Sequence, residues 1–343
     1  SIRRINHRCE SISRVLLKCI SMIEKKSREY EIEDVFRTYG VLTREAGFYF
    51  YFSRKIRELR ECGHEGTARA YASSLRSMQR YLGKKDFPFI KLSSRIISDY
   101  QGKLLASGIC DNTIGFYLHN IKALFRKGCR EMGLELPCPF RDISIKTEKT
   151  LKRSLDPVVI KTLSAIELEK DSPLSLARDI FMFSFYTRGM SFVDIALLKK
   201  RHVFPGEICY RRHKTDQLMR VGINKEISRI LERYKNVPGE YIFPLFPAER
   251  DPYAGYRNAY HRIRYSLGKI SRVIGLEFPL RLHAARHSWA TIAKVNGASV
   301  HVIGECLGHT SEKTTRIYLK ELDHSALDAV NNQVADFILA VDD

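Results

Sequence analysis

The residue types best suited to chemistry on a phosphate gather in one short run near the carboxyl end of this chain. Between residues 282 and 320 the run contains His283, Arg286, His287, His309 and Tyr318. In a helix, His283 and Arg286 share a face because they are three residues apart, and His287 is a near neighbour. The transition state of phosphodiester transfer gathers negative charge on the non-bridging oxygens, and fixed guanidinium and imidazole groups stabilise that charge without a metal. A phenol can then act as the nucleophile and hold the phosphate as a covalent ester.

Taken singly, each of these histidines is typical of a helix cap or a helical core, and Tyr318 is one of seventeen tyrosines. The ordered set is what indicates a reactive site. Apolar spacing predicts two helices in the run, separated by Asn296-Gly297 and ended by Gly308. Their core positions are Trp289, Ile292, Val295, Val302, Ile303 and Leu307. A third helix is predicted to begin at Ser311 and to carry Tyr318 about two turns further on.

An HxxRH motif at 283–287, an LGH motif at 307–309 and Tyr318 nine residues later resemble the carboxy-terminal signature of the tyrosine recombinases, the phage integrase family. A weaker resemblance extends back to about residue 45. The resemblance implies that Tyr318 attacks the DNA phosphate and forms a 3′-phosphotyrosyl link. The 5′ hydroxyl that is freed would then attack the partner strand.

The same resemblance implies a role for each cationic and imidazole group of the run. Arg286 would hold the non-bridging oxygens, His283 would take the phenol proton, and His309 would bond a phosphate oxygen. His287 would be structural, bonded inside the helix packing. No P-loop, carboxylate cluster or Cys/His zinc spacing is present in the sequence, so we expect neither a metal nor any other cofactor.

The segment Arg188-Gly-Met-Ser191-Phe-Val-Asp194 departs from the usual family pattern. Most relatives have an arginine three residues before an acidic residue that opens the next helix, and here Ser191 stands in its place. A branch of relatives from mobile elements and DNA invertases carries this RGMSFVD form. Arg188 is one turn back and can deliver its guanidinium to the same oxygen; the rival hypothesis is that Ser191 donates weakly and Arg178 fills the role. Asp194 is expected to brace the site.

Residues 207–223 alternate like a pair of strands around the turn Lys214-Thr-Asp-Gln. The family places a lysine on this hairpin, which implies that Lys214 protonates the departing 5′ hydroxyl. Arg211 and Arg212 are neighbouring alternatives for that role. A lone lysine in a turn is usually only solvated, so the assignment depends on the resemblance.

The composition points to a polyanionic partner. The formal net charge is +19, which is large for a globular chain, and the basic residues are spread over many segments. No apolar run reaches membrane-spanning length. The eight cysteines include no CxxC pair and are expected to be buried free thiols in a reducing cytoplasm. We therefore expect a cytoplasmic, nucleoid-associated protein.

We expect a mostly α protein with a small β-sheet, divided into five parts. Residues 1–42 form a helical lead, interpreted as the end of an accessory module, although the small sheet of an arm-binding domain is not visible. Residues 43–136 carry four helices, the last capped by Asn112, and resemble the SAM-like core-binding domain of the family. A polar, basic tether at 137–155 leads to an α+β catalytic domain at 156–322 and a tail helix at 323–343. The resemblance implies that the two domains form a C-shaped clamp around DNA.

Basic side chains on helical faces are candidates for contacts to DNA phosphates, which position a protein without reading sequence. A run of charges is equally often just a solvated face, and only the nearby recombinase signature favours DNA. The candidates are Arg69, Arg76, Arg80, Lys122, Arg126, Arg130 and Arg257.

Duplex DNA recombination sites are the expected partner, with a homodimer on one site, a tetramer in synapsis and DNA-bending accessory proteins as further candidates. The sequence leaves open whether the tail helix packs on its own domain or on a neighbouring protomer, and whether the outcome is integration, excision or inversion. A topoisomerase-like enzyme would use the same chemistry without synapsis. A DNA-binding architectural or regulatory protein with a decayed active site is the alternative that Ser191 supports. An RNA-binding protein is disfavoured, because no RNP-like aromatic strand or KH loop is found.

Overall fold

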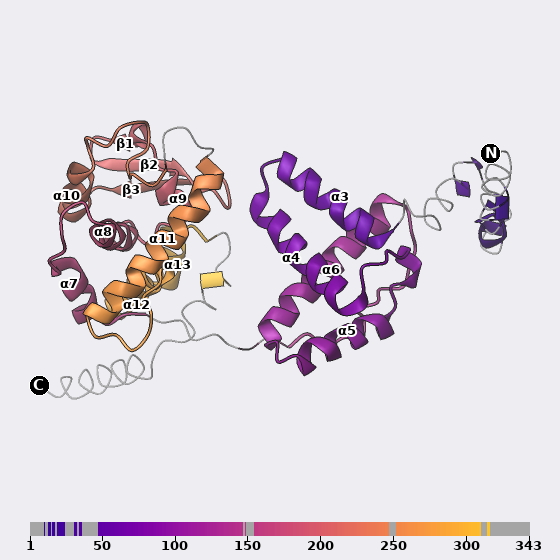
Figure 1. Ribbon diagram of the computed structural model, residues 1–343. Helices are drawn as coiled ribbons and strands as arrows, with labels where there is room; N and C mark the ends of the chain where they lie inside the picture. The colour runs from indigo at the N-terminus through magenta and orange to yellow at the C-terminus, as the bar shows by residue number, and fades with distance from the viewer. Residues whose placement is uncertain are drawn as a thin grey trace, which may run out of the picture. The chain divides into compact units, whose positions relative to one another are not determined.

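The computed structural model describes residues 47–146, 148, 154–246 and 252–309, together with Thr314, Thr315 and isolated positions between 10 and 35. The chain divides into two units, Ser1–Thr150 and Leu151–Asp343, and each is described by itself (Figure 1). The predicted helix from Ser311 onward and the tail at 323–343 lie outside the described residues, except that Thr314 and Thr315 are helical.

From residue 47 onward, the described part of the first unit is a bundle of four α-helices, as the apolar spacing predicts. The helices are α3 (Phe48–Glu61), α4 (Glu65–Leu82), α5 (Ser94–Ala106) and α6 (Asp111–Glu131), with a short 3-10 turn, η2 (Phe89–Lys91), between α4 and α5. Helix α4 packs against each of the other three helices. Ser93 caps α5 by accepting a hydrogen bond from the Ile96 backbone N–H.

The expected cap of α6 was wrong. Cys110 occupies the N-cap position. The Asn112 side chain instead donates to the Glu148 carbonyl and accepts from the Glu148 N–H, both at 3.0 Å. Its amide therefore ties the segment after the bundle back onto α6, which is a tertiary contact that the local sequence does not reveal.

The core of the first unit extends into the segment expected to be a tether. Phe140 is 2% exposed, and Ile143 and Ile145 pack against the same cluster. Gly128 in α6 allows the Phe89 ring to approach, because a Cβ there would lie 2.5 Å from the ring. The polar connection between the units is thus shorter than residues 137–155 suggest.

In the second unit, the other helices and a small sheet surround one buried helix (Figure 1). Its elements are α7 (Pro157–Ala165), α8 (Pro173–Tyr186), α9 (Phe192–Ala196), η3 (Lys200–His202), β1 (Val203–Phe204), β2 (Glu207–Arg211), β3 (Leu218–Gly222), α10 (Lys225–Arg233), α11 (Pro252–Val273), α12 (Leu282–Val295) and α13 (Val300–Leu307). The three strands form an antiparallel sheet in the order β1-β2-β3. The predicted fold class, mostly α with a small sheet, is confirmed.

Helix α8 is the centre of the second unit because its apolar residues are buried around most of its circumference. Residues 180–183 are each at most 2% exposed, and the helix packs against α7, α10, α11 and α12. Asp156 and Ser172 cap α7 and α8, and each is followed by a proline at the first helical position. These local signals explain where the two helices begin.

The described cysteines are free thiols, but the expectation that they are all buried was wrong. Cys62 and Cys110 are exposed. Both lie at helix ends, where Cys62 is the C-cap of α3 and Cys110 the N-cap of α6, so neither faces the core.

Among the described residues, no helix combines the length and the apolar character needed to cross a bilayer.

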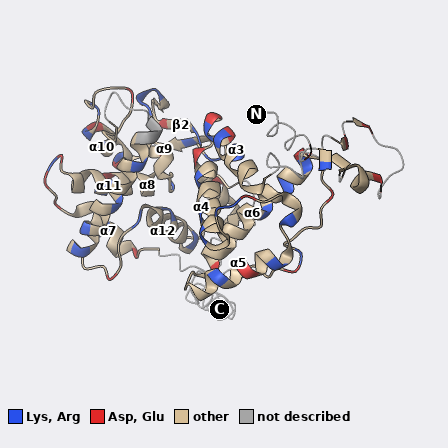
Figure 2. Ribbon diagram, turned by 45° about the vertical axis from the view of Figure 1, so that its right-hand side comes forward, with Lys and Arg blue, Asp and Glu red and all other residues tan. Residues whose placement is uncertain are grey.

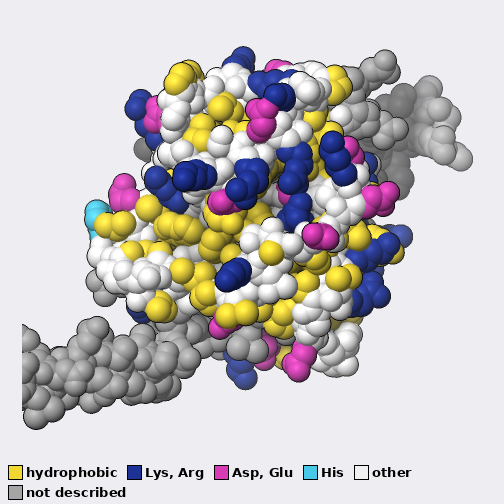
Figure 3. All heavy atoms as spheres, turned by 90° about the vertical axis from the view of Figure 1, so that its left-hand side faces the viewer, with side chains coloured by type: hydrophobic (Ala, Val, Ile, Leu, Met, Phe, Trp, Pro, Cys, Tyr) yellow, Lys and Arg dark blue, Asp and Glu magenta, His cyan; other side chains and the backbone are white. Residues whose placement is uncertain are grey.

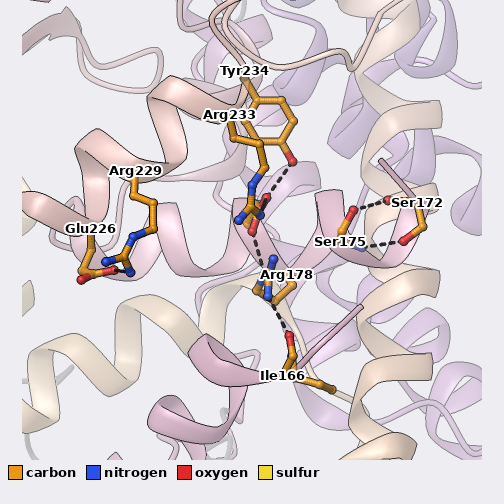
Figure 4. A network of polar contacts seen from close by, with 9 residues as sticks. Ile166, Ser172, Ser175, Arg178, Glu226, Arg229, Arg233 and Tyr234 are labelled. Carbon is orange, nitrogen blue, oxygen red and sulfur yellow. Dashed lines mark hydrogen bonds and ion pairs between the residues drawn. The ribbon is translucent and has the colours of Figure 1, made fainter. Parts of the chain in front are cut away.

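A buried carboxylate joins α8 to α10 (Figure 4). Asp179 is 2% exposed and accepts hydrogen bonds from Arg178 Nε at 2.6 Å, from Arg233 Nη1, and from the Tyr234 hydroxyl at 2.9 Å. Arg178 Nη1 also donates to the Ile166 carbonyl at 2.9 Å. Burial, together with the Asp179 charge, raises the pKa of Tyr234, so its hydroxyl remains a donor. The network therefore holds Arg178 in a structural role.

Replacing Asp179 with alanine should lower the free energy of unfolding by about 3 kcal/mol, because it removes the buried carboxylate and leaves three hydrogen-bond donors without their acceptor. The value is at the lower end for a buried pair, since the Arg233 side chain is 36% exposed and partly screened by solvent. Urea denaturation measures the change. The matched control is Glu226→Ala, which removes an exposed partner of Arg229 on the same helix α10 and should change stability by only about 0.5 kcal/mol. Equal effects of the two substitutions would contradict the structural role of Asp179.

Candidate active site

The guanidinium of Arg286 lies where three segments of the second unit meet. Arg286 is 6% exposed on α12. Its Nη1 donates to the Gly189 carbonyl at 2.9 Å, and its Nη2 donates to the Leu307 carbonyl and lies 3.1 Å from His309 Nε2. The loop after α8 and the end of α13 are therefore tied to one buried cation.

Gly189 must be glycine for this arrangement to exist. Its φ is +77°, and a Cβ built there would lie 2.5 Å from Arg286 Cγ and 2.9 Å from Arg286 Cα. The preceding residue, Arg188, also has a positive φ of 60°, which is costly for a residue with a Cβ. This pair of left-handed residues turns the chain sharply and brings Arg188 toward the sheet, where its Nη1 makes a long hydrogen bond of 3.5 Å to the Arg220 carbonyl on β3.

Asp194 connects the loop after α8 with the β2–β3 hairpin. It is 5% exposed, its Oδ2 accepts a hydrogen bond from the Ser191 hydroxyl at 2.6 Å, and its Oδ1 accepts from the His213 backbone N–H at 2.8 Å. Ser191 therefore orients the carboxylate, and the carboxylate holds the residue that precedes Lys214. The geometry is that of a brace and supports the role expected for Asp194.

The hairpin reaches the turn that ends α13. In the antiparallel pair, Tyr210 faces Met219 and Arg211 faces Leu218, which leaves residues 212–217 as the loop. Lys214 is exposed in that loop. Arg212 Nη1 donates to the carbonyl of Gly308, the residue before His309.

His309 is held as a neutral imidazole. Burial, followed by the charges of Arg286, Arg212 and Lys214, lowers its pKa from the ordinary 6.5 to about 4. An arginine nitrogen only donates hydrogen bonds, so His309 Nε2 accepts from Arg286 and the proton of the neutral ring is on Nδ1, which donates to Thr315 Oγ1 at 2.9 Å. Both nitrogens face protein groups, and the contact of His309 with a phosphate stays a prediction.

Three arginines act on one buried hydroxyl. Burial and then Asp194 raise the pKa of Tyr210, while Arg212, Arg286 and Arg188 lower it, with a net increase. Arg212 and Arg286 act on both Tyr210 and His309, while Arg188 acts on Tyr210 and Lys214 acts on His309. Sequence reasoning treated Arg212 only as an alternative to Lys214, and its position directly after β2 was the available signal.

His283 lies on α12, three residues before Arg286. Its side chain is exposed, and its ring centroid is 4.6 Å from that of His287, with the ring planes at 85°. His283, Arg286 and Ser191 line one cavity of about 270 Å³, which Tyr256 and Tyr260 of α11 also border. Tyr318, the predicted nucleophile, lies outside the described residues.

Lysine and arginine residues are spread over the helices of both units (Figure 2). They also gather on the face of the second unit that Figure 3 shows, among apolar side chains and a smaller number of acidic ones. Of the predicted DNA contacts, Arg69 and Lys122 are half-buried, and Arg69 Nε pairs with Glu65 at 2.9 Å. The exposed ones are Arg76, Arg80, Arg126, Arg130 and Arg257. Their role in binding remains a prediction.

Two family models match the chain. Residues 154–324 match the phage integrase family, and residues 47–140 match the phage integrase SAM-like domain. The tyrosine recombinase XerC of Shewanella oneidensis is 26% identical over 226 residues, which cover 63% of this chain and 70% of the relative. The tyrosine recombinase XerD of Pseudomonas putida is 24% identical over 262 residues, covering 74% and 86%.

Solved structures of similar fold include a lambda integrase dimer bound to a COC′ core site, with a TM-score of 0.59, 16% identity, and coverage of 79% of this chain and 95% of that one. The Tn1549 transposon integrase in complex with transposon right end DNA gives a TM-score of 0.60 at 14% identity, covering 84% and 99%. The chain belongs to the tyrosine recombinase (phage integrase) family, whose members cut and rejoin DNA. The expectations for family, fold and reaction are thereby confirmed.

The His309 ring should titrate near pH 4, well below the ordinary 6.5. Since the unfolded chain takes up this proton at higher pH than the folded one, the contribution of His309 to stability is complete above about pH 6.5 and is lost as the pH falls toward 4. NMR titration of the imidazole signals, assigned with His309→Gln, measures the midpoint. A His309 signal that titrates near pH 6 would contradict the neutral, Nδ1-protonated ring.

Proposed function

We propose that this chain is a site-specific recombinase that exchanges DNA strands through a covalent 3′-phosphotyrosyl intermediate on Tyr318. The observation that carries the assignment of residues is the meeting of cations around His309. Arg286 Nη2 lies 3.1 Å from His309 Nε2, Arg212 Nη1 donates to the adjacent Gly308 carbonyl, and the carbonyl of Gly189, the residue after Arg188, accepts from Arg286 Nη1. Such a group of fixed cations, close to a neutral imidazole, is suited to stabilise the charge of a reacting phosphate.

In the proposed cleavage step, the Tyr318 oxygen forms a bond to phosphorus while the bond from phosphorus to the 5′ oxygen breaks. His283 takes the phenol proton, and the Lys214 ammonium gives a proton to the departing 5′ oxygen. Arg286 and Arg188 hold the non-bridging oxygens, and His309 bonds one of them once its N–H turns from Thr315 to the phosphate. Religation is the reverse step, with the 5′ hydroxyl of the partner strand as the nucleophile.

The choice of Arg188 over Arg178 as the replacement for the missing arginine is supported by their surroundings. The charge of Arg188 acts on Tyr210 together with that of Arg286. Arg178 lies in the first half of α8, where its guanidinium binds Asp179 and the Ile166 carbonyl. Ten residues separate the two arginines along the chain, most of them in α8. Because a helix rises about 1.5 Å per residue, the two arginines lie well apart. Ser191, whose hydroxyl donates to Asp194, acts in this proposal as a positioning group.

Duplex DNA is the proposed partner. The structural relatives include a lambda integrase dimer bound to a core site and a lambda integrase tetramer bound to a Holliday junction. By analogy, we propose that the two units of this chain close on DNA as a C-shaped clamp, as a dimer on one site and a tetramer in synapsis. The same proposal places the enzyme with the nucleoid in the cytoplasm, and assigns a supporting role to DNA-bending proteins.

A suicide DNA substrate, nicked so that the cleaved fragment diffuses away, should trap wild-type protein as a covalent adduct. Tyr318→Phe should give no adduct while still binding the same duplex, because only the nucleophilic oxygen is removed. Denaturing gel electrophoresis detects the adduct, and digestion followed by mass spectrometry locates it. If the wild type forms no adduct and so does not differ from Tyr318→Phe, a DNA-binding protein with a decayed site is favoured. An adduct formed equally by Tyr318→Phe would assign the nucleophile to another residue.

Arg188→Ala should reduce the rate constant of cleavage about 10²–10³-fold, the loss typical of one donor to a developing oxyanion. A scissile methylphosphonate, which lacks one negative charge, should recover part of that loss. Single-turnover cleavage of the suicide substrate measures both rates. Arg178→Ala is the comparison: it should lower stability through Asp179 but leave the cleavage rate of the folded protein near that of the wild type. The opposite ranking would assign the role to Arg178.

A further inference from the structure

We infer that Arg212 is a positioning residue that holds Lys214, the proposed proton donor, against the turn that carries His309. This inference rests on the proposed role of Lys214. Arg212 itself is half-buried at the end of β2, two residues before Lys214. Its function would be to join the hairpin to a segment almost one hundred residues further along the chain.

The first support is the contact between the hairpin and the turn after α13. Arg212 Nη1 donates to the Gly308 carbonyl. Gly308 has a left-handed φ of +63°, and a Cβ there would lie 2.9 Å from Met219 Sδ on β3 and 3.4 Å from Arg212 Nη1. The turn is thus pressed onto the hairpin at the residue that precedes His309.

The second support is the way Arg212 closes the loop that contains Lys214. The Arg212 N–H donates to the Gln217 carbonyl at 2.8 Å, and the Arg212 carbonyl accepts from Asp216 N–H at 2.8 Å. On the adjacent residue, the His213 N–H donates to Asp194 Oδ1 at 2.8 Å. Backbone hydrogen bonds therefore close the loop and tie it to Asp194, and the Arg212 guanidinium ties it to the turn after α13.

The neighbouring arginine shows what a residue without this role looks like. The Arg211 guanidinium pairs with Asp216 inside the same hairpin, and the two side chains are 64% and 83% exposed. That contact stabilises the turn but reaches no other element. Arg212 differs because its charged donor meets a backbone carbonyl of another segment, where a charge-assisted bond is stronger than a neutral one.

The expected consequence concerns the leaving group. General acid catalysis contributes about 10²–10⁴-fold to a rate, and a displacement of about 1 Å can remove about 10²-fold of it. Arg212→Ala should therefore slow cleavage of ordinary DNA by about 10²-fold, approaching the effect of Lys214→Ala. Arg212→Lys keeps the charge but not the planar, extended donor, and should also be slow.

The test uses a scissile phosphate whose bridging 5′ oxygen is replaced by sulfur. A thiolate departs without accepting a proton, so a defect in proton donation disappears on this substrate. Lys214→Ala, Arg212→Ala and Arg212→Lys should all recover toward the wild-type rate. The double variant Arg212→Ala/Lys214→Ala should be no slower than Lys214→Ala alone on the ordinary substrate.

The outcomes separate the two levels of the proposal. If Lys214→Ala is not recovered by sulfur, the proposed role of Lys214 fails, and this inference fails with it. A second outcome is that the sulfur substrate restores the cleavage rate of Lys214→Ala but not that of Arg212→Ala, or that only a methylphosphonate restores the rate of Arg212→Ala. Arg212 would then bind the phosphate, and the positioning role would be overturned. An Arg212→Ala protein as fast as the wild type would also overturn it.

Arg229→Ala serves as the matched control. It removes the same charge from the second unit at a side chain that is 70% exposed and pairs with Glu226 on α10. Its cleavage rate should be unchanged on both substrates. Thermal unfolding and DNA binding of each variant show that the protein is folded and bound, and Arg212→Lys provides a second, charge-retaining readout if Arg212→Ala unfolds.

Discussion

The buried guanidinium of Arg286 is the interaction on which the arrangement of the site depends. A buried charge is costly unless its donors are satisfied, and here the carbonyls of Gly189 and Leu307 and the ring of His309 meet this cation. These groups come from the loop after α8 and from the end of α13, so the geometry of one side chain fixes two loops at once. Burial and then the charge of Arg286 lower the pKa of His309, which keeps the ring neutral beside this permanent cation.

Elements with strong local signals agree with the sequence prediction. The starts of α7 and α8 follow from Asp156 and Ser172 before proline, and the breaks at Gly297 and Gly308 bound α12 and α13. Features that depend on distant partners were not predictable. Examples are the tie between Asn112 and Glu148, the burial of Phe140, and the reach of Arg212 to Gly308. The resemblance pointed to the motif residues of the site, because a motif can be recognised from residue types and their spacing. The contacts that bring these residues together are tertiary and could not be recognised in that way.

Ser191 stands where most relatives have an arginine, and its hydroxyl still supports the site. A hydroxyl has no positive charge with which to hold a phosphate, but it can orient the Asp194 carboxylate within its own turn. The carboxylate then acts on the hairpin through the His213 N–H. Ser191, Asp194 and Arg212 thus hold side chains that are proposed to touch DNA, and the structure separates the groups that position from those proposed to react.

At Arg188 the left-handed backbone lowers the stability of the protein, while the arginine side chain is the one proposed to hold the phosphate. A residue with a Cβ at φ 60° costs about 1 kcal/mol or more relative to glycine, which adopts this region freely. Random mutagenesis followed by selection for heat resistance alone would therefore enrich glycine or asparagine at this position. Such selection would produce a more heat-resistant protein that lacks the guanidinium proposed to hold the phosphate, so directed evolution of this enzyme must select for recombination and thermal stability together.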